Sequence, residues 1–158
     1  MDAIDRKILA LLQADGRMTL TYLAGQVQLS VSRCQRRVRE LERSGTIQGY
    51  RAIVDPELMG FGFEVIAFAT LMQAGTVDEF DAAIAEVPEI VEAQRLFGEP
   101  DYLLRIVAVD RKSYQAFYDK TLTRLPGLRG LNSTFVMKQA VPSRPLPDLK
   151  AARGRTAS

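Results

Sequence analysis

The chain has 158 residues, of which 47% are hydrophobic and 25% charged, the balance of a soluble globular protein with one ordinary domain or two small ones. No apolar run exceeds five residues. A membrane-spanning helix needs roughly 18, so we expect no membrane span. The chain has no histidine and one cysteine, Cys34, which excludes histidine-dependent triads, imidazole metal sites and an intramolecular disulfide. We therefore predict no catalytic residues, no metal site and no cofactor.

Charged side chains are distributed unevenly along the chain. Residues 1–54 carry nine Arg or Lys and five Asp or Glu, residues 55–110 carry two and twelve, and residues 111–158 carry ten and two. This division predicts a basic N-terminal part, an acidic middle and a basic C-terminal part. The acidic first five residues lack the basic-then-apolar order of a signal peptide, so we expect the protein in the cytoplasm.

Three short helices are predicted in the first 50 residues. The first covers about residues 2–14, where apolar residues recur at helical spacing before a turn at Asp15-Gly16. Thr19 is a suitable cap for a second helix and Ser30 for a third, whose apolar stripe consists of Val31, Cys34, Val38 and Leu41. Only about three residues separate the second and third helices, which predicts the sharp bend of a helix-turn-helix.

The predicted third helix carries five arginines away from its apolar stripe, namely Arg33, Arg36, Arg37, Arg39 and Arg43. A guanidinium donates two parallel hydrogen bonds, which suits phosphate oxygens and the guanine edge, and the major groove of DNA admits one helix. The first turns of the helix contain no acid, and in helix-turn-helix proteins this end approaches the bases. We therefore predict a DNA-binding helix. The alternative is a basic face that only meets solvent.

The rest of the chain is predicted to alternate strands and helices in the order βαββαβ. Strands are expected at 61–73, 89–97, 101–109 and 128–139, with one helix that ends at Pro88 and another that ends at Pro126. Ile84-x-x-Val87-Pro88 recurs as Leu122-x-x-Leu125-Pro126, each time at the end of a helix. Two interleaved βα units of this kind predict a ferredoxin-like sandwich, with one antiparallel sheet and both helices on one side.

Such a sandwich leaves one face of its sheet uncovered. If Ile66, Phe68, Leu104 or Ile106 lie on that face, they form a larger apolar patch than a soluble monomer usually exposes. A second copy of the chain is the simplest cover, so we predict an oligomer. The alternative is that the N-terminal part folds back over the sheet.

Motifs of three kinds follow one another between about residues 2 and 140. They are Ile4-Asp5-x-x-Ile8-x-x-x-Leu12-x-x-Asp15-Gly16-Arg17, then Leu29-Ser30-x-x-x-Cys34-x-x-Arg37-Val38-Arg39-x-Leu41-Glu42-x-x-Gly45-x-Ile47-x-Gly49-Tyr50, then Gly98-x-x-Asp101-Tyr102-Leu103-Leu104. Together they resemble the leucine-responsive regulator/AsnC (Lrp/AsnC) family of prokaryotic transcription factors. Gln28 departs from that pattern, because the family usually has a glycine there.

The resemblance implies an α+β protein with a helix-turn-helix domain at 1–50, a strand-like hinge at 51–60, a ferredoxin-like effector-binding and oligomerisation domain at 61–140 and a basic tail at 141–158. It implies homodimers that often assemble to octamers, and an amino-acid effector that retunes binding to double-stranded DNA. It places Ser30, Ser32, Arg33, Gln35, Arg36 and Arg39 at or near the operator. It places Gly98 to Asp101, Tyr102, Thr134, Phe135 and Val136 near the effector.

The Gly98 loop has chemistry that suits an amino acid. The Asp101 carboxylate is able to accept hydrogen bonds from an ammonium group, and a glycine lets backbone N–H groups approach a carboxylate. The alternative is a plain hairpin turn. Arg105, inside an apolar strand, is expected to pair with an acid across the sheet.

The sequence thus predicts a cytoplasmic, nucleoid-associated transcriptional regulator. Its affinity for DNA should fall steeply with salt, because arginine–phosphate contacts release counterions. One alternative is an enzyme on the βαββαβ fold that uses Asp101, Glu92 and Tyr102, and another is an amino-acid sensor that docks a protein. In the tail, Lys150, Arg153 and Arg155 either attract DNA phosphates or keep the chain soluble.

Overall fold

The computed structural model describes residues 1–72 and 74–147, so the tail cations Lys150, Arg153 and Arg155 lie outside the described residues. The chain divides into two compact units. The first comprises residues 1–53 with the described part of the tail, 141–147, and the second comprises Val54–Ala140. Within the described ranges, no helix is long and apolar enough to cross a membrane.

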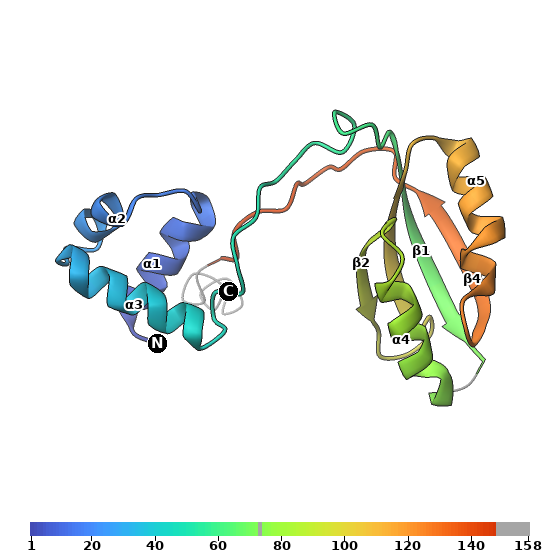
Figure 1. Ribbon diagram of the computed structural model, residues 1–158, viewed down its shortest axis with the longest axis horizontal. Coiled ribbons are helices and arrows are strands. Elements are labelled where there is room, and N and C mark those ends of the chain that lie inside the picture. The colour runs from blue at the N-terminus through green and yellow to red at the C-terminus, as the bar shows by residue number, and fades with distance from the viewer. Residues whose placement is uncertain (73, 148–158) are drawn as a thin grey trace, which may run out of the picture. The chain divides into compact units, whose positions relative to one another are not determined.

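The first unit is made of three helices, α1 (Ala3–Ala14), α2 (Leu20–Gln26) and α3 (Val31–Arg43), shown in Figure 1. Each begins after a side chain that accepts a hydrogen bond from the first turn. Thr19 and Ser30 have this role, as predicted, and Asp2 caps α1 in a reciprocal capping box with Asp5. The helices bury an apolar core that includes Ile8, Leu23, Cys34, Val38 and Leu41.

The bend between α2 and α3 depends on one residue in the left-handed region. Gln28 has φ = 56°, which explains why a glycine is usual there in the family that the motifs resemble. The Gln28 N–H donates to Gly25 O at 3.2 Å, and the Leu29 N–H donates to Ala24 O at 2.9 Å. These bonds satisfy the last carbonyls of α2 and turn the chain towards the Ser30 cap.

The second unit is one antiparallel sheet with two helices. Its elements are β1 (Phe63–Leu71), α4 (Val77–Ala85), β2 (Ile90–Arg95), β3 (Tyr102–Ala108), α5 (Arg111–Lys120) and β4 (Leu128–Phe135). Short 3-10 helices precede α4 and follow α5. The strand order β2-β3-β1-β4 confirms the predicted βαββαβ arrangement. The strands are shorter than predicted, because pairing rather than composition ends them.

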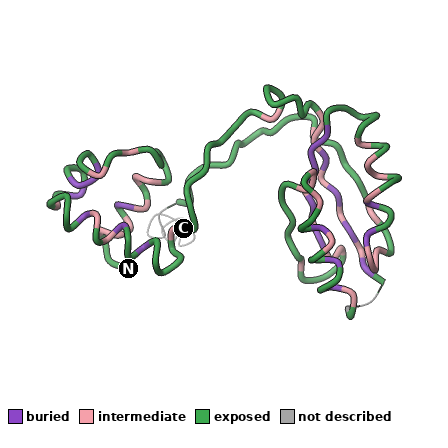
Figure 2. The backbone as a smooth tube through the Cα atoms, viewed as in Figure 1, coloured by how far each residue is buried: buried purple, intermediate pink, exposed green. Residues whose placement is uncertain are grey.

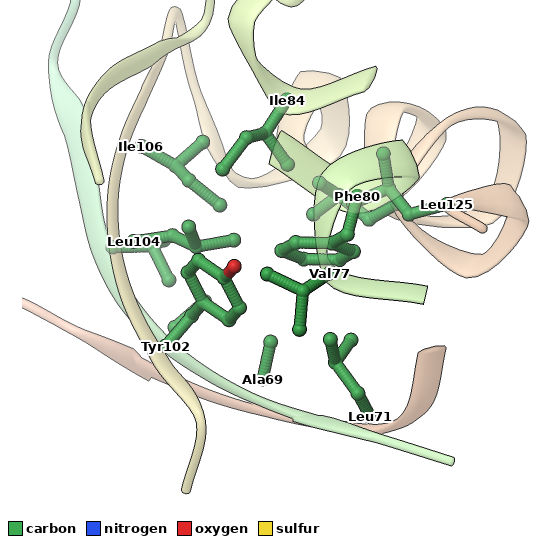
Figure 3. Packing of buried hydrophobic residues seen from close by; sticks show 12 residues of the cluster. Ala69, Leu71, Val77, Phe80, Ile84, Tyr102, Leu104, Ile106 and Leu125 are labelled. Carbon is green, nitrogen blue, oxygen red and sulfur yellow. The ribbon is translucent and has the colours of Figure 1, made fainter. Parts of the chain in front are cut away.

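One face of the sheet packs against both helices. Val65 lies opposite Ile106, and Ala67 lies opposite Leu104. These residues join Phe80 and other side chains in the core, which Figure 3 shows. Leu104 and Ile106, two of the four residues considered for the uncovered face, therefore do not lie on it, since both are fully buried beneath the helices. The sequence could not reveal this, because β3 is apolar on both of its faces.

The opposite face of the sheet carries Ile66 and Phe68 on β1, as expected. Ile66 lies opposite Arg105, and Phe68 lies opposite Leu103. The predicted cross-strand ion pair is present, since Arg105 Nε donates to Glu64 Oε1 at 2.7 Å. The face thus combines these apolar side chains with the partly buried ion pair and with polar neighbours on β4, Thr134 and Asn132.

The internal repeat in the sequence corresponds to the same turn made twice. The Val87 N–H donates to Ile84 O, and the Leu125 N–H donates to Leu122 O, each at 3.2 Å. Each turn leads its helical segment into an edge strand of the sheet.

The predicted hinge, 51–60, contains no strand in this chain. Residues 56–60 form a turn in which the Phe61 N–H donates to Pro56 O at 2.8 Å. Every residue of 51–60 is exposed except Pro56, which is half-buried, and this segment is green in Figure 2.

Candidate nucleic-acid interface and ligand site

The exposed surface of α3 carries a ridge opposite its buried stripe. Ser32, Arg36, Arg39 and Arg43 are spaced by four, three and four residues, so they share one side of a helix with 3.6 residues per turn. All four are exposed, whereas Cys34, Val38 and Leu41 anchor the other side in the core. Burial raises the pKa of the Cys34 thiol, which supports its predicted role as a small apolar core residue.

Arg37 does not project outward with the other arginines. Its Nη1 donates to Asp5 Oδ1 at 2.6 Å and to Asp2 Oδ2 at 2.8 Å. The hydrogen bonds that Arg37 donates to Asp5 and Asp2 raise the pKa of Arg37, and the Asp5 N–H and Arg37 together hold the pKa of the Asp2 carboxyl below its usual value. The expectation that all five arginines project freely is therefore wrong, and Arg37 instead ties α3 to the start of α1.

The ion pairs of Arg37 with Asp2 and Asp5 were not predicted from the sequence. Their signal is Asp2-x-x-Asp5, which reads as a capping box but also puts two carboxylates at one helix end. No local pattern links that pair to Arg37, about 30 residues later.

Arg43 also has a partner within its own helix. Its Nη2 donates to Glu40 Oε1 at 2.7 Å and its Nε donates to Glu40 Oε2 at 3.1 Å, a bidentate pair between neighbouring turns. These hydrogen bonds raise the pKa of Arg43 and lower that of Glu40. Two of the five predicted DNA-contacting arginines are thus already paired with acids of this chain.

The other three arginines, Arg33, Arg36 and Arg39, are exposed and form no ion pair with any carboxylate of the described residues. Ser30 is occupied as the helix cap, because its Oγ accepts from the Arg33 N–H at 3.4 Å. The surface beside Ser30 therefore carries guanidinium groups whose positive charge no acid among the described residues neutralises.

Two open clefts border α3. One is lined by Asp5, Arg36 and Arg37, together with Met1, Glu40, Leu41, Ser44 and Thr46. The other is lined by Gln35, Arg39 and Tyr50, together with Leu12, Gly16, Met18, Leu20, Leu23, Val38 and Glu42. The half-buried Gln35 thus belongs to the wall of a cleft. Hollows on its two sides leave the helix as a raised element of the kind that enters a DNA groove.

In the second unit, the loop between β2 and β3 is anchored at Asp101. The Leu71 N–H donates to Asp101 Oδ2 at 2.7 Å, and the Asp101 N–H donates to Ala69 O at 2.9 Å. At the tip, Gly98 has φ = 121°, and Glu99 pairs with Arg129 of β4. Asp101 is the carboxylate that is expected to bind the effector, and one of its oxygens is therefore used to hold the end of β1.

Tyr102 lies in the core and not at a ligand surface. It is 1% exposed, and its hydroxyl donates to Asp81 Oδ1 at 2.6 Å. Its ring packs on Phe80 with centroids 4.7 Å apart, as Figure 3 shows. Burial is the largest cause that raises the pKa of Tyr102 to about 12, and the hydrogen bond to Asp81 is the second. Tyr102, one of the predicted effector residues, is thus held in the core by Asp81, a partner that the sequence did not reveal.

The remaining predicted effector residues lie elsewhere on the sheet. Thr134 pairs with Ile66, and Phe135 pairs with Val65 and stacks on Phe63. The Val136 N–H donates to Glu64 O at 2.8 Å. At about 3.3 Å per residue, these three lie roughly 10 to 17 Å along β1 from Ala69, where Asp101 is bound. A single chain therefore does not bring the two groups together around one amino acid.

Acidic and thiol side chains do not gather into a metal site in the described residues, where no group of three or more such ligands occurs. The exposed arginines of α3 are instead chemically suited to bind anionic groups.

The chain matches two family models. Residues 1–48 match a winged helix-turn-helix DNA-binding model, and residues 65–146 match the Lrp/AsnC ligand binding domain. The two matches correspond to the three-helix unit and to the sheet unit. A DNA-binding head and a ligand-binding domain in one chain define the class of ligand-responsive transcriptional regulators.

Curated relatives match this chain over most of their own length. The DNA-binding transcriptional activator DecR of Escherichia coli is 37% identical over 93% of this chain and 98% of its own. A leucine-responsive regulatory protein of Haemophilus influenzae is 39% identical over 88% of this chain and 85% of its own.

Solved structures that resemble this chain are also of transcriptional regulators. A transcriptional regulator of Neisseria meningitidis in complex with L-Met has a TM-score of 0.88 at 32% identity, over 96% of this chain and 99% of that one. An AsnC family regulator of Agrobacterium tumefaciens has a TM-score of 0.84 at 34% identity, over 93% and 97%. The chain belongs to the Lrp/AsnC family, and it is a DNA-binding transcriptional regulator and not an enzyme.

Proposed function

We propose that a homodimer of this chain inserts two copies of α3 into successive major grooves of a roughly palindromic operator, about 34 Å apart. The observation that supports this most is the exposed ridge, in which Arg36 and Arg39 have no acid partner among the described residues, whereas Arg43 is paired with Glu40. Ser30, Arg33 and Gln35 flank the ridge. Such a regulator works at the nucleoid, in the cytoplasm.

The open face of the sheet supports dimerisation. Ile66, Phe68 and Leu103 are only half-buried there, around the Arg105–Glu64 ion pair. A symmetric pairing of two such faces removes this apolar surface from water and covers the ion pair. Dimers then assemble further, to octamers, through surfaces other than the covered face.

An amino acid is the proposed effector, bound at the Gly98–Asp101 loop. The other oxygen of Asp101, Oδ1, suits the ammonium group, and the backbone near Gly98 suits the carboxylate. Thr134, Phe135 and Val136 contribute from another copy of the chain, since within one chain they are too far away. The effector acts by binding one assembly state better than another.

Electrophoretic mobility shift with duplex DNA from upstream of its own gene tests the DNA-binding proposal. We expect a sequence-selective complex whose affinity falls steeply between 50 and 200 mM salt, by roughly 10³-fold or more if six or more phosphates are contacted. A complex insensitive to salt, or equal binding to unrelated duplex, would contradict it.

Thermal unfolding with each of the twenty amino acids in turn tests the effector proposal. A ligand at a hundredfold excess over its Kd stabilises the protein by about 2.7 kcal/mol, so the correct effector raises the midpoint. Asp101→Asn keeps an acceptor for the Leu71 N–H and should lose that rise. An unchanged rise in Asp101→Asn would remove the loop from the effector site.

A further inference from the structure

The five arginines of α3 differ in whether they are available to DNA. Arg37 is bound by Asp2 and Asp5, and Arg43 is bound by Glu40. Arg33, Arg36 and Arg39 are exposed and have no acid partner among the described residues. An arginine that is already bound to a carboxylate must release it before it binds DNA, so Arg37 and Arg43 are poorly suited to reading bases.

The unpaired arginines also differ in the direction in which they leave the helix. At 100° per residue, Arg36 stands about 170° from the centre of the buried stripe of Cys34, Val38 and Leu41, so it points straight away from the core. Arg33 stands about 105° from the same centre, on the flank of the helix. A helix that lies in the major groove turns its outermost side towards base edges and its flanks towards the phosphate walls.

Position along the helix favours the same residue. Arg36 is the sixth residue of α3 and lies one turn after Ser32 on the ridge, within the N-terminal half that approaches bases in helix-turn-helix proteins. Arg36 also lines one of the two clefts beside α3. Arg39 lies a turn further along, where the helix moves away from the bases.

We propose that Arg36 is a specificity-determining residue that selects a guanine in each half-site through hydrogen bonds to O6 and N7, whereas Arg33 contacts a phosphate. This inference rests on the proposed insertion of α3 into the major groove. It predicts two symmetry-related guanines in the operator, one for each subunit, about 10 base pairs apart.

The test is selection of binding sites from a randomised duplex library, followed by titration of the selected duplex at several salt concentrations. It compares the wild type with Arg36→Ala, Arg36→Gln, Arg33→Ala and Arg43→Ala. The Arg43 variant controls for the loss of one exposed positive charge from α3, because Glu40 already holds that guanidinium. Circular dichroism checks that each variant is folded.

We expect the wild type to select guanine at one position per half-site. Arg36→Ala should lose that preference and bind the selected duplex about 5- to 150-fold more weakly for each guanine that it no longer recognises. Arg36→Gln should change the preferred base to adenine, because a glutamine amide matches N6 and N7 of adenine. Arg33→Ala should keep the guanine and lower the salt slope by about 2 for the dimer, since each phosphate that is no longer neutralised removes roughly 0.9. Arg43→Ala should select the wild-type sequence.

Three results would overturn the inference while leaving the proposed function intact. They are a wild-type site without a preferred guanine, an Arg36→Ala site that equals the wild-type one, and an Arg36→Ala variant that binds all sequences more weakly with a lower salt slope. The last result would make Arg36 a phosphate-binding residue. If the wild type selects no sequence at all, both the inference and the proposed function fall.

Discussion

The hydroxyl of Tyr102 on β3 donates a hydrogen bond of 2.6 Å to Oδ1 of Asp81 on α4. The ring of Tyr102 lies in the apolar core, whereas Asp81 is exposed, so the bond joins the interior of the sheet unit to its surface. It fixes α4 over β3 by a polar contact in addition to the packing of Phe80.

Removal of this hydroxyl should destabilise the sheet unit without breaking its core. A hydrogen bond to a charged group contributes about 1.5–3 kcal/mol, and exposure of Asp81 to water recovers part of it, so we expect Tyr102→Phe to cost about 1–2 kcal/mol. Urea-induced unfolding measures the change. Tyr114→Phe is the matched control, because its hydroxyl bonds to the neutral Ser133 and should cost no more than about 1 kcal/mol. Equal costs in the two variants would show that the charge of Asp81 is unimportant.

Alkaline pH should weaken the fold through the same residue. The pKa of Tyr102 is about 12 in the folded protein against 10.0 for a free tyrosine, because burial and Asp81 disfavour the phenolate. The contribution of Tyr102 is therefore fully present below pH 10 and is lost as the pH rises towards 12. Unfolding free energies measured from pH 9 to 11.5 should decline less steeply in Tyr102→Phe than in the wild type. Parallel curves would contradict the assignment.

The turn between α2 and α3 should become more stable with a glycine at position 28. Gln28 has φ = 56°, a left-handed conformation that costs about 1–2 kcal/mol for a residue with a side chain. Glycine avoids that cost but loses about 0.5–1 kcal/mol through the greater freedom of the unfolded chain. We expect Gln28→Gly to stabilise the three-helix unit by about 0.5–1 kcal/mol in thermal or urea unfolding. A destabilised variant would mean that the glutamine side chain contributes more than its strained backbone costs.

A charge on the open face of the sheet should separate the proposed dimer. Phe68→Glu places two unpaired carboxylates, one from each copy, in a symmetric interface. Juxtaposed like charges cost several kcal/mol, so the dimer should bind at least about 100-fold more weakly. Sedimentation at micromolar concentration measures the mass. Tyr22→Glu, which adds the same charge to an exposed aromatic of α2, should stay at the wild-type mass. If Phe68→Glu also keeps the wild-type mass, the copies pair through another surface.

Short-range patterns in the sequence predicted most of the secondary structure. Thr19 and Ser30 cap the helices that the apolar spacing indicated, because a cap bonds within three residues of itself. The repeat of Ile84-x-x-Val87 and Leu122-x-x-Leu125 predicted two equivalent helix ends for the same reason. Asp110 likewise caps α5, because its side chain accepts from the Ser113 N–H.

The sequence by itself determined the class of this protein, a helix-turn-helix head followed by a βαββαβ ligand-binding domain, because periodicity, caps and family motifs are all local. Only the tertiary structure decided which arginines remain available, since Arg37 meets Asp2 and Asp5 across more than thirty residues. It also decided that Leu104 and Tyr102 face the helices, because a strand apolar on both sides takes its orientation from its neighbours. Contacts between distant residues depend on packing and register, and no short window of sequence contains them.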